Sequence, residues 1–406
     1  MTDSGRQTKA ARPTPLDVLA LPHVVEAIAT GLDNPYDFRC FLDAVPRVLW
    51  TPALTAFLDC NTVMPSSVIT KWPRILLRSM ELPPFVLTLV AATLPLRPRI
   101  ELRGAIRDAA PLLASFVAVL GPALSSVTLN FFIGCTVQGQ AISDLLLQRC
   151  PRLRKVTIMC FTLSENETVE LNDLLAVVAH PHVEDLDISL PDMTATPRLG
   201  HLLATWLSTA PATILQLANV TQMDHDGAIA FCDALQASAT LRELTMYNAP
   251  AFGGFHGRTL PVSLKTLAWE SRPDRVVDVT ALTDLATAVG PTQLKRLYCN
   301  VFGQLAACSA AAPMLSQLQC LMVSRLHADD MPALIAGLSS VPALTSLHLP
   351  DCDLSSSTEL LLETLATTCM HLESLDIYSY LLTRREVVAV LSRTLDLPRL
   401  TSLSIR

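Results

Sequence analysis

The sequence predicts an α/β solenoid, a stack of short parallel strands that alternate with helices, and three observations predict it. The pattern L-x-x-L-x-L recurs along the chain, as in LTSLHL at residues 344–349. Successive copies begin 23 to 30 residues apart. The stretches between them, such as residues 355–369 and 383–395, have the apolar spacing of helices. A period of this length is typical of repeat proteins.

Each copy of the pattern predicts one strand. The fourth and sixth residues are apolar and flank a polar fifth residue, as expected for a strand with one buried face. A weak copy begins at Trp72, and a regular array of about 12 repeats follows from residue 97. Its copies begin at Arg97, Leu124, Leu153, Val183, Ala212, Leu241, Leu264, Leu294, Leu318, Leu344, Leu372 and Leu400.

The packing of strands and helices predicts how the repeats stack. Strands lie about 4.8 Å apart, whereas helices need about 10 Å. One strand and one helix in each repeat therefore predict a right-handed horseshoe with a concave parallel β-sheet and convex helices. The copies at residues 241 and 264 are unusually close. Since residues 248–263 (NAPAFGGFHGRTLPVS) lack a helical pattern, we expect a loop there and a local change of curvature.

The repeats resemble leucine-rich repeats of the ribonuclease-inhibitor-like and cysteine-containing classes. Residues 148–158 (QRCPRLRKVTI) and 367–377 (TTCMHLESLDI) are similar to the C-P-x-L-x-x-L-x-L junction of the second class. The resemblance covers about three quarters of the chain. At the ninth position, where the family has Asn or Cys, only Cys352 conforms. The usual side-chain ladder is therefore largely missing, and the backbone N–H groups must be satisfied in another way.

Residues 19–50 predict two short helices before the array. Four apolar residues share one face of the first helix: Leu21, Val25, Ile28 and Leu32. Pro35 interrupts this helix, and Asp37 is the expected N-cap of the second. A helical segment of this kind covers the end of a solenoid, because the first repeat has no preceding neighbour.

The same segment resembles an F-box, whose skeleton is L-P-x-x-(V/L)-x-x-I-x-x-x-L…P-x-D-(L/F)…V-x-x-x-W. It departs from that skeleton in two places. The acidic residue that usually follows Leu-Pro lies later, at Glu26, and Pro46 stands where the family usually has Cys. The resemblance implies binding to the small adaptor of a cullin-type ubiquitin ligase. The implied adaptor-binding residues are Leu21, Pro22, Val25, Ile28, Leu32, Pro35, Phe38, Val45 and Trp50. The alternative is a helical cap that only covers the first repeat.

Four segments are expected along the chain. They are a disordered tail at residues 1–14, an F-box-like helical segment at 15–58, a linker and N-terminal cap at 59–96, and a leucine-rich-repeat solenoid at 97–406. The array runs to a last strand in LTSLSIR. An uncovered edge strand favours association, so we expect a partner there, self-association, or fraying of the last strand.

No catalytic, cofactor-binding or metal-binding residues are predicted. The chain has no Gly-rich phosphate loop, nucleophile elbow or H-E-x-x-H motif. His180 and His182 lack a cluster of cysteines or carboxylates nearby in sequence, so a metal role is not expected. Asp224 follows a strand pattern and is the expected N-cap of a helix. We therefore expect that the chain is not an enzyme.

The outward positions of the concave sheet form the predicted binding surface. These are the fifth and seventh residues of each copy, and three of the five tyrosines occupy them. Tyrosine is enriched at interaction hot spots because it buries a large area and keeps one polar atom. Basic and acidic residues are mixed on this face. The predicted partner contacts are Asp187, Tyr247, Glu270, Tyr298, His348, Asp376 and Tyr378.

Composition argues against several classes of protein. The net charge is −7, without the strongly basic footprint of a nucleic-acid-binding protein. Residues 109–143 carry no charge, but Gly121, Pro122 and several polar residues interrupt the run, so no membrane span is expected. The eleven cysteines form no C-x-x-C pair, and the N-terminus is polar. Reduced thiols in a cytoplasmic or nuclear protein are predicted.

These features favour a non-enzymatic adaptor that binds a protein target on its concave face. The F-box resemblance implies a substrate-recognition subunit of an SCF-type ubiquitin ligase. The alternative is a plain leucine-rich-repeat scaffold or inhibitor whose N-terminus only caps the solenoid. A GTPase activator is a remote alternative, because some helical leucine-rich-repeat proteins have that role, but no set of polar catalytic residues is found for it.

Overall fold

The computed structural model describes residues 21–64, 66–106, 109–131, 138–160, 167–191, 196–220, 223–248, 254–271, 278–355, 357–378, 383–394 and 397–405. The expected tail at residues 1–14 and the start of the F-box-like segment lie outside these ranges. The chain divides into two compact units. The first comprises residues 1–105, 110–128 and 148–153, and the second comprises 106–109, 129–147 and 154–406. The predicted boundary at residues 96 and 97 divides the chain by sequence repeat, and it stays a prediction.

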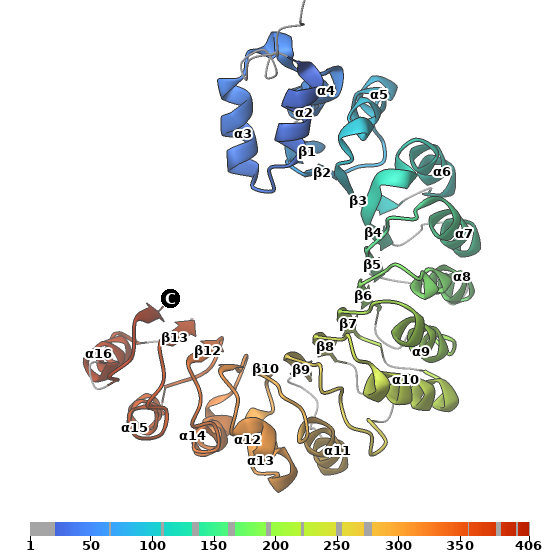
Figure 1. Ribbon diagram of the computed structural model, residues 1–406. Coiled ribbons are helices and arrows are strands. Elements are labelled where there is room, and N and C mark those ends of the chain that lie inside the picture. Colours follow the sequence, from blue (N-terminus) through green and yellow to red (C-terminus); the bar gives the residue numbers. More distant parts are fainter. Residues whose placement is uncertain are drawn as a thin grey trace, which may run out of the picture. The chain divides into compact units, whose positions relative to one another are not determined.

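The first unit combines helices with the strands of the earliest repeats (Figure 1). Its strand order is β1-β2-β3-β4, with β1 antiparallel to β2 and β2 parallel to β3. Its elements are α2 (Pro22–Thr30), α3 (Pro35–Ala44), η1 (Arg47–Leu49), α4 (Pro52–Val63), β1 (Val68–Lys71), β2 (Arg74–Leu77), α5 (Pro84–Ala92), η2 (Leu94–Leu96), β3 (Arg99–Ile106), α6 (Ala109–Leu120), η3 (Gly121–Ala123) and β4 (Leu124–Phe131).

In the second unit, strands β5 to β14 follow one another in chain order. Figure 1 shows its helices on one side of these strands. The elements up to β9 are α7 (Gly139–Arg149), β5 (Lys155–Cys160), α8 (Glu167–Leu174), η4 (Leu175–Ala179), β6 (Asp185–Ser189), α9 (Leu199–Thr209), β7 (Ile214–Ala218), α10 (His225–Ala237), β8 (Glu243–Tyr247) and β9 (Thr266–Glu270). The later elements are α11 (Val279–Val289), β10 (Arg296–Cys299), α12 (Phe302–Ala306), η6 (Ser309–Ala311), α13 (Ala312–Leu315), β11 (Cys320–Met322), η7 (Ala328–Asp330), α14 (Met331–Leu338), β12 (Ser346–Pro350), α15 (Thr358–Thr368), β13 (Ser374–Tyr378), α16 (Arg384–Arg393) and β14 (Ser402–Ile405).

Strand register confirms the repeat. In parallel pairs, Leu244 of β8 is the partner of Leu215 in β7 and of Leu267 in β9, so fourth positions meet fourth positions. The weak copy at Trp72 is confirmed as well, because Ile75 pairs with Ile100 in the same register. The chain is therefore a repeat protein with a mostly parallel sheet. The right-handed horseshoe and its curvature stay predictions.

Burial follows the alternation that the pattern requires. In β6, β7, β8, β12 and β13, the second and fourth strand residues are buried and the other three are half-buried. Leu215, Leu244 and Leu347 are fully buried. Burying such a leucine stabilises the fold by roughly 1.5–3 kcal/mol. The buried fourth and sixth residues of each repeat thus pack against those of the neighbouring repeats and stabilise the stack.

Main-chain bonds take over part of the role of the missing side-chain ladder. The eighth residue of several repeats has a left-handed backbone, with φ of 56° at Asn219, 46° at Asn248 and 56° at Arg325 and Asp351. Asn and Asp adopt this region more readily than other side chains. The N–H of Asn219 donates to the carbonyl of Tyr247 in the next repeat at 2.9 Å, and the other three residues bond in the same way. The N–H groups are therefore satisfied by the neighbouring strand.

A loop replaces the helix between β8 and β9, as predicted for the described part of that segment, residues 254–265. Phe255 is buried in this loop, and its ring lies 5.6 Å from that of Trp269. The carboxylate of Asp284 in α11 accepts hydrogen bonds from the N–H groups of Phe255 and Gly257, the latter at 3.0 Å. Gly254 has φ of 96°, and a Cβ atom there would lie 2.5 Å from Asp284 Oδ2. The buried Phe255 ring and the Asp284 carboxylate therefore both fix the loop to the rest of the unit.

The helices of the first unit share their core with its first repeat. Trp72 stacks on Phe38 with ring centroids 4.7 Å apart, and Phe57 meets both rings edge-on. The indole N–H of Trp72 donates to the carbonyl of Leu32 at 2.8 Å. Residues 59–96 supply strands, a helix and an aromatic anchor to this unit, and the expected linker and N-terminal cap there stays a prediction.

Helix starts agree in part with the sequence. Asp224 caps α10, as predicted, and Thr383 caps α16 with a capping box. The cap of α3 is Asn34 rather than Asp37, which lies in the first turn, because Pro35 occupies the first helical position. Ser357 precedes α15 without a side-chain cap. Among the described residues, no helix is long and apolar enough to span a membrane.

Candidate functional site

The candidate site is the side of the second unit's sheet that faces away from its helices, here called the open face. It is formed by the third, fifth and seventh residues of each repeat, with the second residue at the entry to each strand. No described helix of this unit lies over it (Figure 1). Its polar side chains on β6, β8, β12 and β13 are half-buried, since they stand beside one another on strands that lie about 4.8 Å apart, whereas Arg242 and Arg296 are exposed.

At β5 and β6 the charges of the open face are paired. Lys155 and Asp185, both third residues, form a salt bridge of 2.6 Å, and Arg154 and Glu184, both second residues, form another of 2.6 Å. Asp187 stands next to them. Burial raises the pKa of Asp187 above its usual value, while Lys155 lowers it and Asp185 raises it further. Both cations at this end of the face are therefore paired with a carboxylate.

Across β8 to β12 lies a groove of about 730 Å³, here called the basic groove. Four of its side chains are cationic, and Glu243 is the only carboxylate among its lining residues. None of the four cations forms a salt bridge with another described residue, and Lys265 donates only a long 3.5 Å bond to Gln293. The lining residues are Arg242, Glu243, Lys265, Thr266, Lys295, Arg296, Tyr298, Gln319, Cys320, Thr345, Ser346 and His348.

Tyr298 and Cys320 line the centre of the basic groove. Burial is the main cause that raises the pKa of the Tyr298 phenol. Burial also raises the pKa of the Cys320 thiol, against the opposing effect of the Arg296 charge. Both groups therefore stay neutral, and the phenol adds an aromatic surface with a hydrogen-bonding tip among the cations.

A second polar cluster lies where β8 to β11 end. Arg325 extends back across the sheet, and its guanidinium lies 3.4 Å from the hydroxyl of Tyr247. The side chain of Asn300 donates to the carbonyl of Ser271 at 2.6 Å and accepts from its N–H at 3.1 Å. This rim is therefore held in place by its own contacts, with Glu270 and Asp351 close enough to Arg325 to affect its pKa.

Ser346, His348 and Asp376 form a chain of contacts at the end of the groove. The Ser346 hydroxyl lies 2.9 Å from Nε2 of His348, and Nδ1 of His348 lies 3.6 Å from Asp376 Oδ2. The order of atoms is that of a serine hydrolase. However, the N–H groups of Thr345 and Ser346 both donate to the carbonyl of Gln319, so neither is available to stabilise an oxyanion. The cluster orders His348, and the expectation that the chain is not an enzyme stays a prediction.

The structure separates the predicted contacts into groups. Tyr298 and His348 line the basic groove, with Asp376 beside His348, whereas Tyr247 and Glu270 lie at the Arg325 rim. Asp187 belongs to the paired end, and Tyr378 is half-buried in β13. Sequence alone did not predict that Arg242, Lys265, Lys295 and Arg296 form no salt bridge with another described residue. The sequence contains the information needed for this prediction. Arg154 and Glu184 occupy the same position in consecutive repeats and form a pair, whereas that position is basic in the three consecutive repeats of the groove.

The nine candidate adaptor-binding residues differ in accessibility. Leu21 is 44% exposed and Pro22 is exposed, but Val25 and Phe38 lie in the core of the first unit and are not accessible to a partner. Glu26 accepts a hydrogen bond from Thr51 and so links α2 to the start of α4. The half-buried members are Ile28, Leu32, Pro35, Val45 and Trp50.

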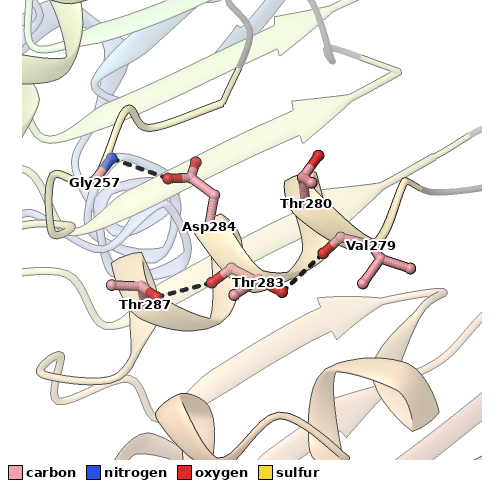
Figure 2. A pocket seen from close by; sticks show the side chains of 6 residues that line it. All are labelled: Gly257, Val279, Thr280, Thr283, Asp284 and Thr287. Atoms are coloured by element: carbon pink, nitrogen blue, oxygen red, sulfur yellow. Dashed lines mark hydrogen bonds between the residues drawn. The ribbon is translucent and has the colours of Figure 1, made fainter.

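A shallow pocket of about 410 Å³ beside the α11 helix is a structural feature rather than a candidate ligand site (Figure 2). Its most polar group is the carboxylate of Asp284, which already binds the loop through Gly257. The hydroxyls of Thr283 and Thr287 donate to carbonyls one turn earlier in the helix, at 2.8 and 2.9 Å. The polar atoms of this pocket are therefore engaged within the protein.

Metal and thiol chemistry find no support in the described residues. No group of three or more His, Cys, Asp or Glu side chains there could hold a metal ion. Burial raises the pKa values of Cys60, Cys150, Cys232 and Cys299 to about 12. A thiol with such a pKa is a poor nucleophile at neutral pH, so these cysteines act as small buried apolar residues.

Comparison with known proteins does not assign a family. No family model matches the chain, and no curated protein matches it. One solved structure, the crystal structure of the Rad7 and Elc1 complex in yeast, has a TM-score of 0.46 with this chain at 14% identity, over 94% of this chain and 92% of that chain. A likeness this weak carries no argument about function. The F-box and leucine-rich-repeat assignments therefore stay predictions.

Proposed function

We propose that the protein is a non-enzymatic adaptor that binds a protein target on the open face of its second unit. One observation carries this proposal: a row of polar and aromatic side chains stands on a sheet that no described helix of the unit covers. Side chains held on a sheet are ordered before binding, so this chain loses less side-chain entropy when a partner binds. The free thiols of the described cysteines suit a cytoplasmic or nuclear location.

We further propose that the first unit recruits the small adaptor of an SCF-type ubiquitin ligase. The F-box resemblance supports this, together with the exposed Leu21 and Pro22 at the start of α2. Tyr36 and Val48 are also exposed in the same unit, at 73% and 83%. Exposed apolar side chains in a small helical unit are what an adaptor with an apolar groove would cover.

The ligase proposal is tested by measuring retention of the adaptor on the immobilised full-length chain. Leu21→Asp should lower retention at least about ten-fold, because it places a charge in a desolvated contact. Leu360→Asp, at a site 52% exposed on α15, is the matched control and should retain the adaptor fully. An intact chain that fails to retain the adaptor, while a known F-box protein does, refutes the ligase role.

A scaffold whose helices only cap the repeats is the competing proposal, and the packing around Trp72 favours it. Phe38 and Phe57 enclose that ring, so the helices stabilise the first repeat whatever else they bind. Under this proposal Leu21→Asp would change the binding of no specific partner. Adaptor retention by the same two variants therefore distinguishes the two roles.

A further inference from the structure

The basic groove carries a charge opposite in sign to the net charge of the whole chain. The chain has a net charge of −7, yet the groove is lined by four cations and a single carboxylate. The paired charges at β5 and β6 show that this sheet can neutralise its cations through neighbouring strands. At β8 to β10 it does not, because the corresponding neighbours of Lys265 are Arg242 and Lys295. Like charges side by side are unfavourable unless something else binds them.

The geometry of these cations defines what can bind. Arg242, Lys265 and Lys295 are second residues of three consecutive repeats, and Arg296, which follows Lys295, is the first residue of β10. Strands about 4.8 Å apart make this row roughly 10 Å long, the length of about three extended residues. Tyr298 and the Ser346–His348 pair line the same groove and add aromatic surface and hydrogen-bonding groups.

We propose that the basic groove binds a short acidic segment of a partner protein, with three or four extended residues whose carboxylates lie along Arg242, Lys265, Lys295 and Arg296. Charge complementarity is the reason for this choice, since the groove lacks the anions that would neutralise its own cations. A nucleic acid fits less well, because its continuous charge needs a longer basic track and is repelled by the acidic remainder of the chain. This inference rests on the adaptor proposal and specifies the chemistry of its target.

The test measures binding of a fluorescent Asp- and Glu-rich decapeptide to the purified full-length chain by anisotropy. The intact chain should bind it with an affinity that falls as NaCl rises, and the Asn- and Gln-substituted peptide should not bind. Lys295→Gln with Arg296→Gln should weaken binding at least about ten-fold. The matched control is Arg154→Gln with Lys155→Gln, which removes the same charge from the same repeat positions and should weaken binding less than about three-fold.

Several outcomes overturn the proposal. Equal weakening by both double variants means that net charge, not the groove, attracts the peptide. No binding by the intact chain at physiological salt, or tighter binding of a single-stranded RNA that the groove variant abolishes, also refutes it. A phosphorylated peptide that binds more than about ten-fold tighter than the carboxylate peptide would show a phosphate site instead. A cooperative thermal unfolding transition verifies that each variant folds, and the adaptor assay on Leu21 is independent of these results.

Discussion

At the scale of the residue, the surroundings of Asp187 disfavour the charged form of its carboxyl group. Burial raises its pKa above the ordinary value of 3.8, and the nearby Asp185 adds to the effect, while Lys155 opposes it. The folded state thus binds a proton more readily at this site than the unfolded chain. Stability from this group is therefore present at low pH and lost as the pH rises from 3.8 through the raised pKa. At neutral pH the charged carboxylate destabilises the fold.

Asp187→Asn should consequently raise the thermal midpoint at pH 7, and the gain should shrink as the pH falls towards 4. Scanning calorimetry across this range measures it. Asp185→Asn is the opposing control, because it removes the partner of Lys155 and should lower stability slightly at pH 7. A gain for Asp187→Asn that stayed constant with pH would show that the charge is not its cause.

At the scale of the element, the Asp284 carboxylate accepts two main-chain hydrogen bonds from the loop between β8 and β9. Asp284→Ala leaves the N–H groups of Phe255 and Gly257 without their acceptor, which should cost about 1–3 kcal/mol of unfolding free energy. The measurement is chemical denaturation of the full chain. Asp233→Ala removes an exposed ion pair to Arg258 on the same loop and should cost less than about 1 kcal/mol. Equal losses would mean that Asp284 contributes only surface charge.

The elements also show what the sequence alone could predict. Strands were predictable because buried leucines recur at fixed positions, and even the weak copy at Trp72 pairs in register. The aromatic contact between Trp72 and Phe38 was not, since it joins residues from different elements that no period relates. The cap at Asn34 was missed because Asp37 is an equally good capping residue, and only the position of Pro35 decides between them.

The candidate site was predictable in its location and not in its chemistry. Period two along each strand places Tyr247, Tyr298 and His348 on the open face, as the sequence analysis expected. The contact of Ser346 with His348 could have been inferred, because they are two residues apart on one strand. The reach of Arg325 to Tyr247 could not, since a long side chain crosses two intervening strands. Side-chain conformation, rather than strand register, limits such inferences.

At the scale of the whole molecule, the repeats of the second unit contact mainly their neighbours in sequence. Each strand from β6 to β13 pairs with the strand before and after it. Stability in such an array is approximately a sum of local terms between adjacent repeats. A defect in one repeat should therefore open its neighbours and leave distant repeats folded.

Leu267→Ala tests this local behaviour at the centre of the array. Leu267 is fully buried in β9 and pairs with Leu244 and Leu297, so its truncation should cost about 2–5 kcal/mol. Hydrogen exchange followed by mass spectrometry should show lost protection in β8, β9 and β10, with β6 and β13 unchanged. Leu360→Ala, on the exposed surface of α15, should change none of them. A uniform loss of protection across β5 to β14 would contradict the nearest-neighbour account. Such a loss requires that all the strands unfold together as one cooperative core.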